Sequence, residues 1–118
     1  MKVTVPISVG ELLDKISILQ IKSQHTDDPY VIKELKCLTE IAEEQGVYNI
    51  DFLDRLFDVN CNLWVIEDDL REFEKTKTFD AEFVSKARMV YLQNDKRAAI
   101  KREINEHTGS EFFEVKIY

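Results

Sequence analysis

The side chains of this chain that could bind a ligand gather on two stretches, NLWVIEDDLREFEK and VYLQNDKRAAIKREIN. Read as a helix at 100° per residue, the second stretch puts Asn94, Lys101 and Asn105 within roughly 40° of Phe83 and Ala87, on the face that should be buried. A buried cation or amide needs a partner, which is either a carboxylate of the chain or a bound anion. The sequence therefore raises the question of what these polar side chains face.

An apolar seam predicts a long helix opposite that face. It steps by four and three residues over about three heptads, through Phe52, Leu56, Val59, Leu63, Ile66, Leu70 and Phe73. Phe79 and Asp80 then have the spacing of a staple and an N-cap, and they open a last helix that runs to about Thr108. The short connection requires an antiparallel hairpin. A turn at residues 76–80 sets three positions of one helix opposite the other: Trp64 near Gln93 and Asn94, Asn60 near Arg97, and Leu56 near Lys101.

This register predicts a polar layer across the hairpin, in which Glu67 is the one carboxylate that we can place. The candidate ligand-binding residues, with one from the first helix, are Lys15, Trp64, Glu67, Arg71, Tyr91, Asn94, Arg97 and Lys101. Cations without enough internal anions would bind a small anionic ligand. Two other interpretations stay open: the charges lie at a rim with their stems over apolar surface, or they form a buried network in which every member is paired.

The first helix is expected over residues 8–25, because Ser8 and Glu11 have capping-box spacing. It is apolar on more than one face, which predicts a central helix. Lys15 lies on a charged stripe with Glu11 and Lys22, and an ordinary ion pair between Glu11 and Lys15 is the alternative to a role in the polar layer. Asp28-Pro29 then opens a second helix that ends near Gly46.

Both chain ends show the two-residue period of a strand. Apolar side chains alternate at Val3, Val5 and Ile7, and again at Phe113, Val115 and Ile117. Strands this short need a partner, so we expect them to pair with each other or with a second copy of the chain. The predicted fold is mostly α: a single domain over residues 1–118, a bundle of about four helices with a long antiparallel helical hairpin and a small β pair formed by the chain termini.

Composition excludes several functions. The chain has 118 residues, of which 44% are hydrophobic, and 16 basic against 23 acidic residues give a net charge of −7. Such a charge repels nucleic acid and anionic lipid, and no apolar run reaches the roughly 18 residues of a membrane span. Cys37 and Cys61 lack metal-ligand spacing, and the N-terminus lacks the pattern of a signal peptide, so we expect a cytoplasmic protein without a metal or cofactor.

Enzymatic interpretations find little support. Helical NTP pyrophosphatases bind magnesium through paired acidic motifs, which this chain could imitate with Glu40, Glu43, Glu44, Glu67, Asp68 and Glu72, although the spacing differs. A solvated acidic face explains these residues better. A chorismate-mutase-like bundle needs several arginines on a first helix that has none, and neither cysteine has a neighbouring histidine.

Three segments carry a resemblance: VPISVGELLDKISILQIK, NLWVIEDDLREFEK and ARMVYLQNDKRAAIKREINEHTGSEFFEVKIY. Together they resemble the signature blocks of a small uncharacterised bacterial family, a domain of unknown function that also occurs in phage sequences. Its members occur beside, or fused to, glycosyltransferases and repeat proteins of surface-polysaccharide gene clusters, which implies a cytoplasmic accessory role. The matching positions have no assigned role; they are Glu11, Asp14, Lys15, Lys22, Asn62, Trp64, Glu67, Asp68, Arg71, Arg88, Tyr91, Asn94, Asp95, Arg97 and Arg102.

We therefore expect a helical interaction or regulatory module, accessory to surface-polysaccharide or glycosyltransferase systems. Its expected partner is a protein, including a second copy of the chain, because the terminal strands and the apolar first helix leave surface to cover. The alternatives are a binding protein for a small anion or nucleotide sugar and a helical NTP-pyrophosphatase-like enzyme.

Overall fold

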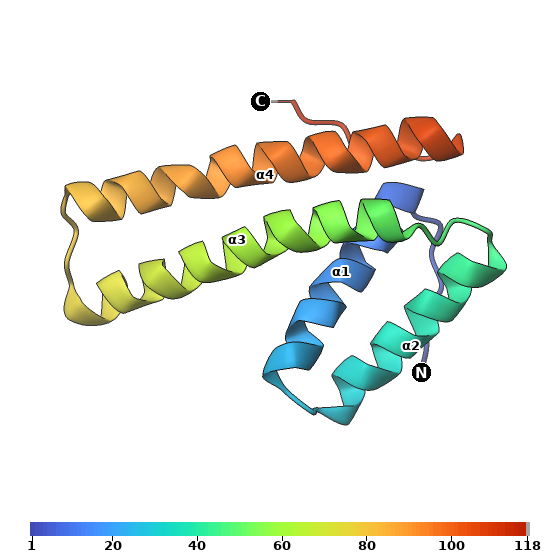
Figure 1. Ribbon diagram of the computed structural model, residues 1–118, viewed down its shortest axis with the longest axis horizontal. Coiled ribbons are helices and arrows are strands. Elements are labelled where there is room, and N and C mark those ends of the chain that lie inside the picture. The colour runs from blue at the N-terminus through green and yellow to red at the C-terminus, as the bar shows by residue number, and fades with distance from the viewer. Residues whose placement is uncertain (118) are drawn as a thin grey trace.

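The computed structural model describes residues 1–117, and in it the chain forms four α-helices (Figure 1). They are α1 (Val9–His25), α2 (Pro29–Glu44), α3 (Ile50–Thr76) and α4 (Ala81–Thr108). The prediction of a mostly α chain with about four helices and a long helical hairpin is confirmed.

Short polar side chains begin the helices at the predicted places. Ser8 Oγ accepts a hydrogen bond from the Glu11 amide at 3.0 Å, and Asp80 Oδ1 accepts one from the Phe83 amide at 3.0 Å. Each bond satisfies one of the backbone donors that a helix leaves free at its first turn. Gly109 ends α4 with a φ of 63°, a left-handed conformation that glycine adopts without a steric cost.

The helices form two hairpins that cross. The short hairpin α1/α2 packs against one end of the long hairpin α3/α4, and α1 contacts all three other helices (Figure 1). The buried core contains Leu12, Leu13, Ile16, Ala42, Phe52, Leu53, Leu56 and Ile104. The chain itself thus covers the several apolar faces of α1, which do not require a second copy.

The other end of the long hairpin extends past α1 and α2, and we call this segment, residues 65–92, the arm (Figure 1). The apolar seam changes character along it. Leu56 and Val59 are buried where α1 crosses, and Ile66 is still buried at the base of the arm, whereas Leu70 and Phe73 further along it are half-buried. Two helices alone cannot enclose a seam, so the arm has an incomplete core.

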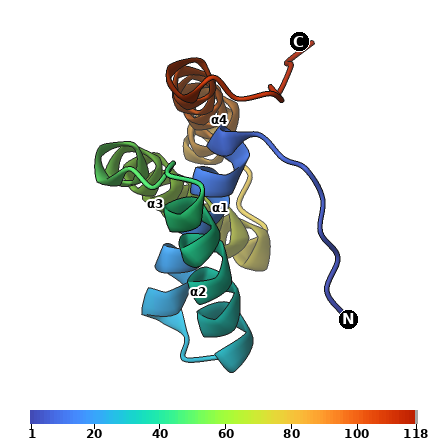
Figure 2. The ribbon, with the colours of Figure 1, turned by 90° about the vertical axis from the view of Figure 1, so that its right-hand side faces the viewer.

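The predicted β pair of the chain termini is wrong, because residues 1–117 contain no strand. Residues 111–117 turn back along α4, where Glu114 forms an ion pair with Lys101 at 2.9 Å and Lys116 forms one with Asp95 at 3.0 Å. Residues 1–7 leave α1 in another direction and are exposed (Figure 2). The alternation at the C-terminal end therefore marks a strap, residues 111–117, whose polar side chains hold α4 while its apolar ones are exposed.

Candidate functional site

Asp14 of α1 lies at the centre of the polar layer and is fully buried. The Arg97 guanidinium of α4 donates from Nε to Asp14 Oδ1 at 2.9 Å and from a terminal nitrogen to Oδ2. Asn60 of α3 donates from Nδ2 to the same Oδ1 at 3.0 Å and to Ser17 Oγ at 2.8 Å. One buried carboxylate thus joins three helices. The predicted proximity of Asn60 and Arg97 is confirmed, because both contact the same oxygen.

Lys101 lies one turn of α4 further along and is 5% exposed. Its Nζ is 2.7 Å from Glu11 Oε2 of α1 and 2.9 Å from Glu114 Oε2 of the strap. Burial acts to lower the pKa of the Lys101 ammonium, but the hydrogen bonds to Glu11 and Glu114 outweigh it, so that the pKa is raised above its ordinary value. The hydrogen bonds to Asp14 likewise raise the pKa of Arg97.

Asn105 completes the layer where α1 begins. Its Oδ1 accepts a hydrogen bond from the Gly10 amide at 2.7 Å, and its side chain is almost fully buried. A Cβ on Gly10 would lie 2.6 Å from the Lys101 carbonyl oxygen, so only glycine allows the two backbones to approach this closely.

These contacts answer why the buried face of α4 becomes polar: it faces the charged side of α1. Sequence reasoning left Arg97 and Lys101 without enough carboxylates, and that part of the argument is wrong, because Asp14, Glu11 and Glu114 neutralise them. The missed residue with the clearest signal is Asp14. On a helical wheel this carboxylate falls between Ile18 and Ile21, on a helix that is apolar on several sides.

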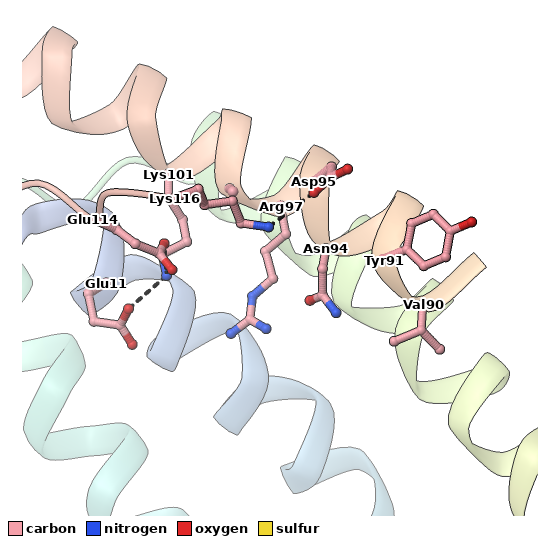
Figure 3. Close-up of a pocket in the computed structure, with 10 residues that line it drawn as sticks. Glu11, Val90, Tyr91, Asn94, Asp95, Arg97, Lys101, Glu114 and Lys116 are labelled. Atoms are coloured by element: carbon pink, nitrogen blue, oxygen red, sulfur yellow. Dashed lines mark hydrogen bonds and ion pairs between the residues drawn. The ribbon is translucent and has the colours of Figure 1, made fainter. Parts of the chain in front are cut away.

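A cavity of about 610 Å³ lies beside this network, between α4, the start of α1 and the strap (Figure 3). Four predicted site residues line it together: Tyr91, Asn94, Arg97 and Lys101. Three acidic side chains, those of Glu11, Asp95 and Glu114, balance the cations Arg97, Lys101 and Lys116 among the lining residues. The cavity is polar and charge-balanced, without a surplus of positive charge.

The other four predicted site residues lie outside this cavity. The Trp64 ring stacks on the His25 ring with centroids 4.4 Å apart, which packs the end of α1 against α3. Lys15, Glu67 and Arg71 are exposed. The eight predicted residues therefore do not form one layer. Four line the cavity beside α4, and the other four lie on α1 and α3.

The titratable and nucleophilic side chains of the described residues are placed as follows. Asp14 is fully buried and already accepts hydrogen bonds from Arg97 and Asn60, so it is a poor general base. Within residues 1–117 no three His, Cys, Asp or Glu side chains are grouped so that they could hold a metal ion. Cys37 and Cys61 are free thiols and half-buried.

The fold and this layer define a four-helix protein in which a buried ion-pair network joins two crossed hairpins. The chain belongs to a family of unknown function, DUF6165, which it matches over residues 1–118. The resemblance to an uncharacterised family is thereby confirmed. No curated protein and no solved structure matches the chain. None of the helices in the described part is both long and apolar enough to cross a membrane.

Proposed function

We propose that this protein is a non-catalytic interaction module that docks on another protein through its arm. The observation that carries this proposal is the exposed apolar surface of the arm. Five large side chains are between 46% and 57% exposed there: Val65, Phe79, Val84, Tyr91 and Leu92. Large apolar side chains are also exposed within residues 30–50, at Tyr30, Ile32, Ile41, Tyr48 and Ile50. Those of the arm lie on a segment whose apolar seam only two helices cover, which favours a partner there.

The buried network supports this proposal because it fixes the base from which the arm extends. Arg97 and Asn60 connect the two helices of the long hairpin to the same carboxylate of α1. The arm is therefore presented at one angle to the α1/α2 hairpin, and a partner would bind a preorganised surface.

The proposed setting is the bacterial cytoplasm, as an accessory to surface-polysaccharide or glycosyltransferase systems. The support is the resemblance described above, which links the family to such gene clusters. An accessory of this kind needs a docking surface and no chemistry of its own.

The test is site-specific photo-crosslinking in cells. A photoreactive phenylalanine analogue at Val84 or Leu92 of the arm should form adducts with a discrete protein. The matched control carries the analogue at Lys33, an exposed position of α2. Adducts that form equally well at Lys33, or none at either arm position, would contradict the proposal.

A second candidate function is the binding of a small anion or nucleotide sugar in the cavity beside α4. The specific observation in its favour is that Tyr91, Asn94, Arg97 and Lys101 meet there. The side-chain amide of Asn94 makes no hydrogen bond to any residue in the described part of the chain, so its donors and acceptor are available to a ligand.

Thermal unfolding tests this second function. Millimolar phosphate or UDP-glucose should raise the melting temperature of the unmutated protein and not that of Asn94→Leu, since a ligand stabilises the state it binds. Equal shifts in both proteins, or none, would refute it. The pyrophosphatase-like alternative needs clustered carboxylates that hold magnesium, and because residues 1–117 provide none we do not propose it.

A further inference from the structure

We infer that α4 docks on α4 of a second copy of this chain, antiparallel across a two-fold axis at the base of the arm, through the face between Val84 and Ala99. This inference names the partner of the docking surface and rests on the proposed function. It is carried by a row of exposed side chains on α4, by their symmetry, and by a cavity at the matching position.

The row lies on the exposed side of α4, and its members Tyr91 and Asp95 also line the cavity beside α4; we call it the outer stripe. Its six members fall within an arc of roughly 100° on the helix and are all exposed; they are Val84, Arg88, Tyr91, Leu92, Asp95 and Ala99. Four of the six are apolar, and the strap contacts the row at Asp95 through Lys116. A helix with apolar stripes on opposite sides has two surfaces to bury.

The outer stripe is symmetric about its centre. A two-fold axis between Tyr91 and Leu92 places Tyr91 against Leu92 of the second copy. The same axis places Arg88 opposite Asp95 and Val84 opposite Ala99, and it repeats each contact. Closed dimers require such a self-complementary patch. Shifting the pairing by one turn would lose the match of opposite charges.

Arg88 and Asp95 each have hydrogen-bonding atoms left for an ion pair across the two-fold axis. Arg88 donates from Nε to the Tyr91 hydroxyl at 3.2 Å, which leaves its two terminal nitrogens directed elsewhere. Asp95 accepts from Lys116 through Oδ1 at 3.0 Å, which leaves Oδ2. An ion pair between Arg88 of one copy and Asp95 of the other therefore breaks neither bond.

A cavity of about 260 Å³ lies beside Ala99, the residue that would face Val84 of the second copy. It lies between α4 and the strap, and its lining combines Ala98, Ala99 and Val115 with the polar side chains Arg102, Asn105, Glu114 and Lys116. The alanines leave space beside α4, and a valine from the facing helix would fill it as a knob fills a hole. The strap residue Val115, which is 75% exposed in the single chain, would then gain an apolar neighbour.

The expected dimer is weak. Val84 to Ala99 is about four turns of helix, or roughly 24 Å. A single helix pair of this length falls short of the roughly 800 Å² per partner that stable complexes bury. We expect self-association in the range of tens to hundreds of micromolar.

Sedimentation equilibrium between 10 and 500 µM tests the inference by charge reversal. Arg88→Asp alone and Asp95→Arg alone should each weaken the dimer at least tenfold, because like charges then face each other twice. The double variant Arg88→Asp/Asp95→Arg should restore most of the affinity. Lys33→Asp on α2 changes the net charge as Arg88→Asp does, and it should leave the dimer unchanged.

A monomer at 500 µM would overturn the inference, and so would a dimer that the single reversals leave intact or the double reversal fails to restore. Crosslinks from Val84 to a different protein would still support the interaction module in that case. The absence of any crosslink would instead remove the proposed function, so the two failures are distinguishable.

Discussion

Removing the Arg97 side chain is the sharpest perturbation of the buried network. The carboxylate of Asp14 is fully buried in the unmutated protein, and in Arg97→Ala it loses both bonds from the guanidinium, with Asn60 as its remaining side-chain donor. Breaking a buried ion pair in this way costs about 3–5 kcal/mol, because an uncompensated charge remains in a poorly solvated site. A chain of this length is stable by roughly 6–18 kcal/mol, so the loss is large.

Urea unfolding, followed by far-ultraviolet circular dichroism, measures this loss. The control is Arg102→Ala, which removes an exposed arginine of the same helix whose pair with Glu106 is accessible to water. That variant should change stability by less than about 1 kcal/mol. Because the penalty resides in the stranded charge, the double variant Asp14→Ala/Arg97→Ala should lose less than the sum of the single variants.

The reasoning is refuted if Arg97→Ala costs less than about 1 kcal/mol. An increase in the stability of Arg97→Ala would contradict the structural network more strongly, because it would mean that Arg97 and Lys101 repel each other despite their carboxylates. That outcome would favour an anion site over a structural network.

Three other predictions concern the contacts of α1 and the strap with α4. Gly10→Ala should destabilise by about 1–3 kcal/mol, since its Cβ would lie 2.6 Å from the Lys101 carbonyl oxygen; a stabilised variant in urea unfolding would contradict the close approach. The raised pKa of Lys101 contributes stability that is complete below the ordinary lysine pKa, about 10.4, and is lost as pH rises through the folded-state value. Lys101→Met should therefore flatten the alkaline fall of stability, and identical pH profiles for the two proteins would count against this. Glu114→Gln should cost less than about 1 kcal/mol, because Lys101 keeps Glu11, and a loss above about 2 kcal/mol in the same assay would show that the strap is essential to the fold.

The helices and their ends were predictable because their signals are local. Ser8 and Asp80 cap α1 and α4 within three residues of the amides they contact, so the sequence around each position contains the whole interaction. The seam from Phe52 to Phe73 likewise predicted the long helix α3, and the short connection predicted its antiparallel pairing with α4. The lower burial of the arm was not predicted, because the period of a sequence does not show where the packing of α1 against this hairpin ends.

The C-terminal strap shows where a local signal is ambiguous. Alternation at Phe113, Val115 and Ile117 is the period of any extended segment, whether it pairs through its backbone or through its side chains. The partners of the residues between these apolar positions decide which kind of pairing occurs. Glu114 and Lys116 form ion pairs with Lys101 and Asp95 of α4, and the sequence pattern of the segment does not indicate these partners.

The candidate site was half predictable for a related reason. The hairpin register brought Asn60 and Arg97 together, because α3 and α4 are connected by a short turn. The hairpin register contained no information about α1, which crosses the hairpin. Asp14 of α1 is 83 residues away from Arg97 in the sequence. The anions that neutralise the layer were therefore missing from the prediction.

The buried network has a consequence for how the arm is presented. A slip of α1 along the long hairpin by one helical turn would move its side chains by about 5.4 Å. Asp14 does not tolerate it, since a slip would remove the donors of Arg97 and Asn60 together and leave a fully buried carboxylate unpaired. The network therefore selects one crossing of the two hairpins. A docking surface on α4 depends on that selection, because a row of six side chains matches a partner only if the helix that bears it has a fixed position.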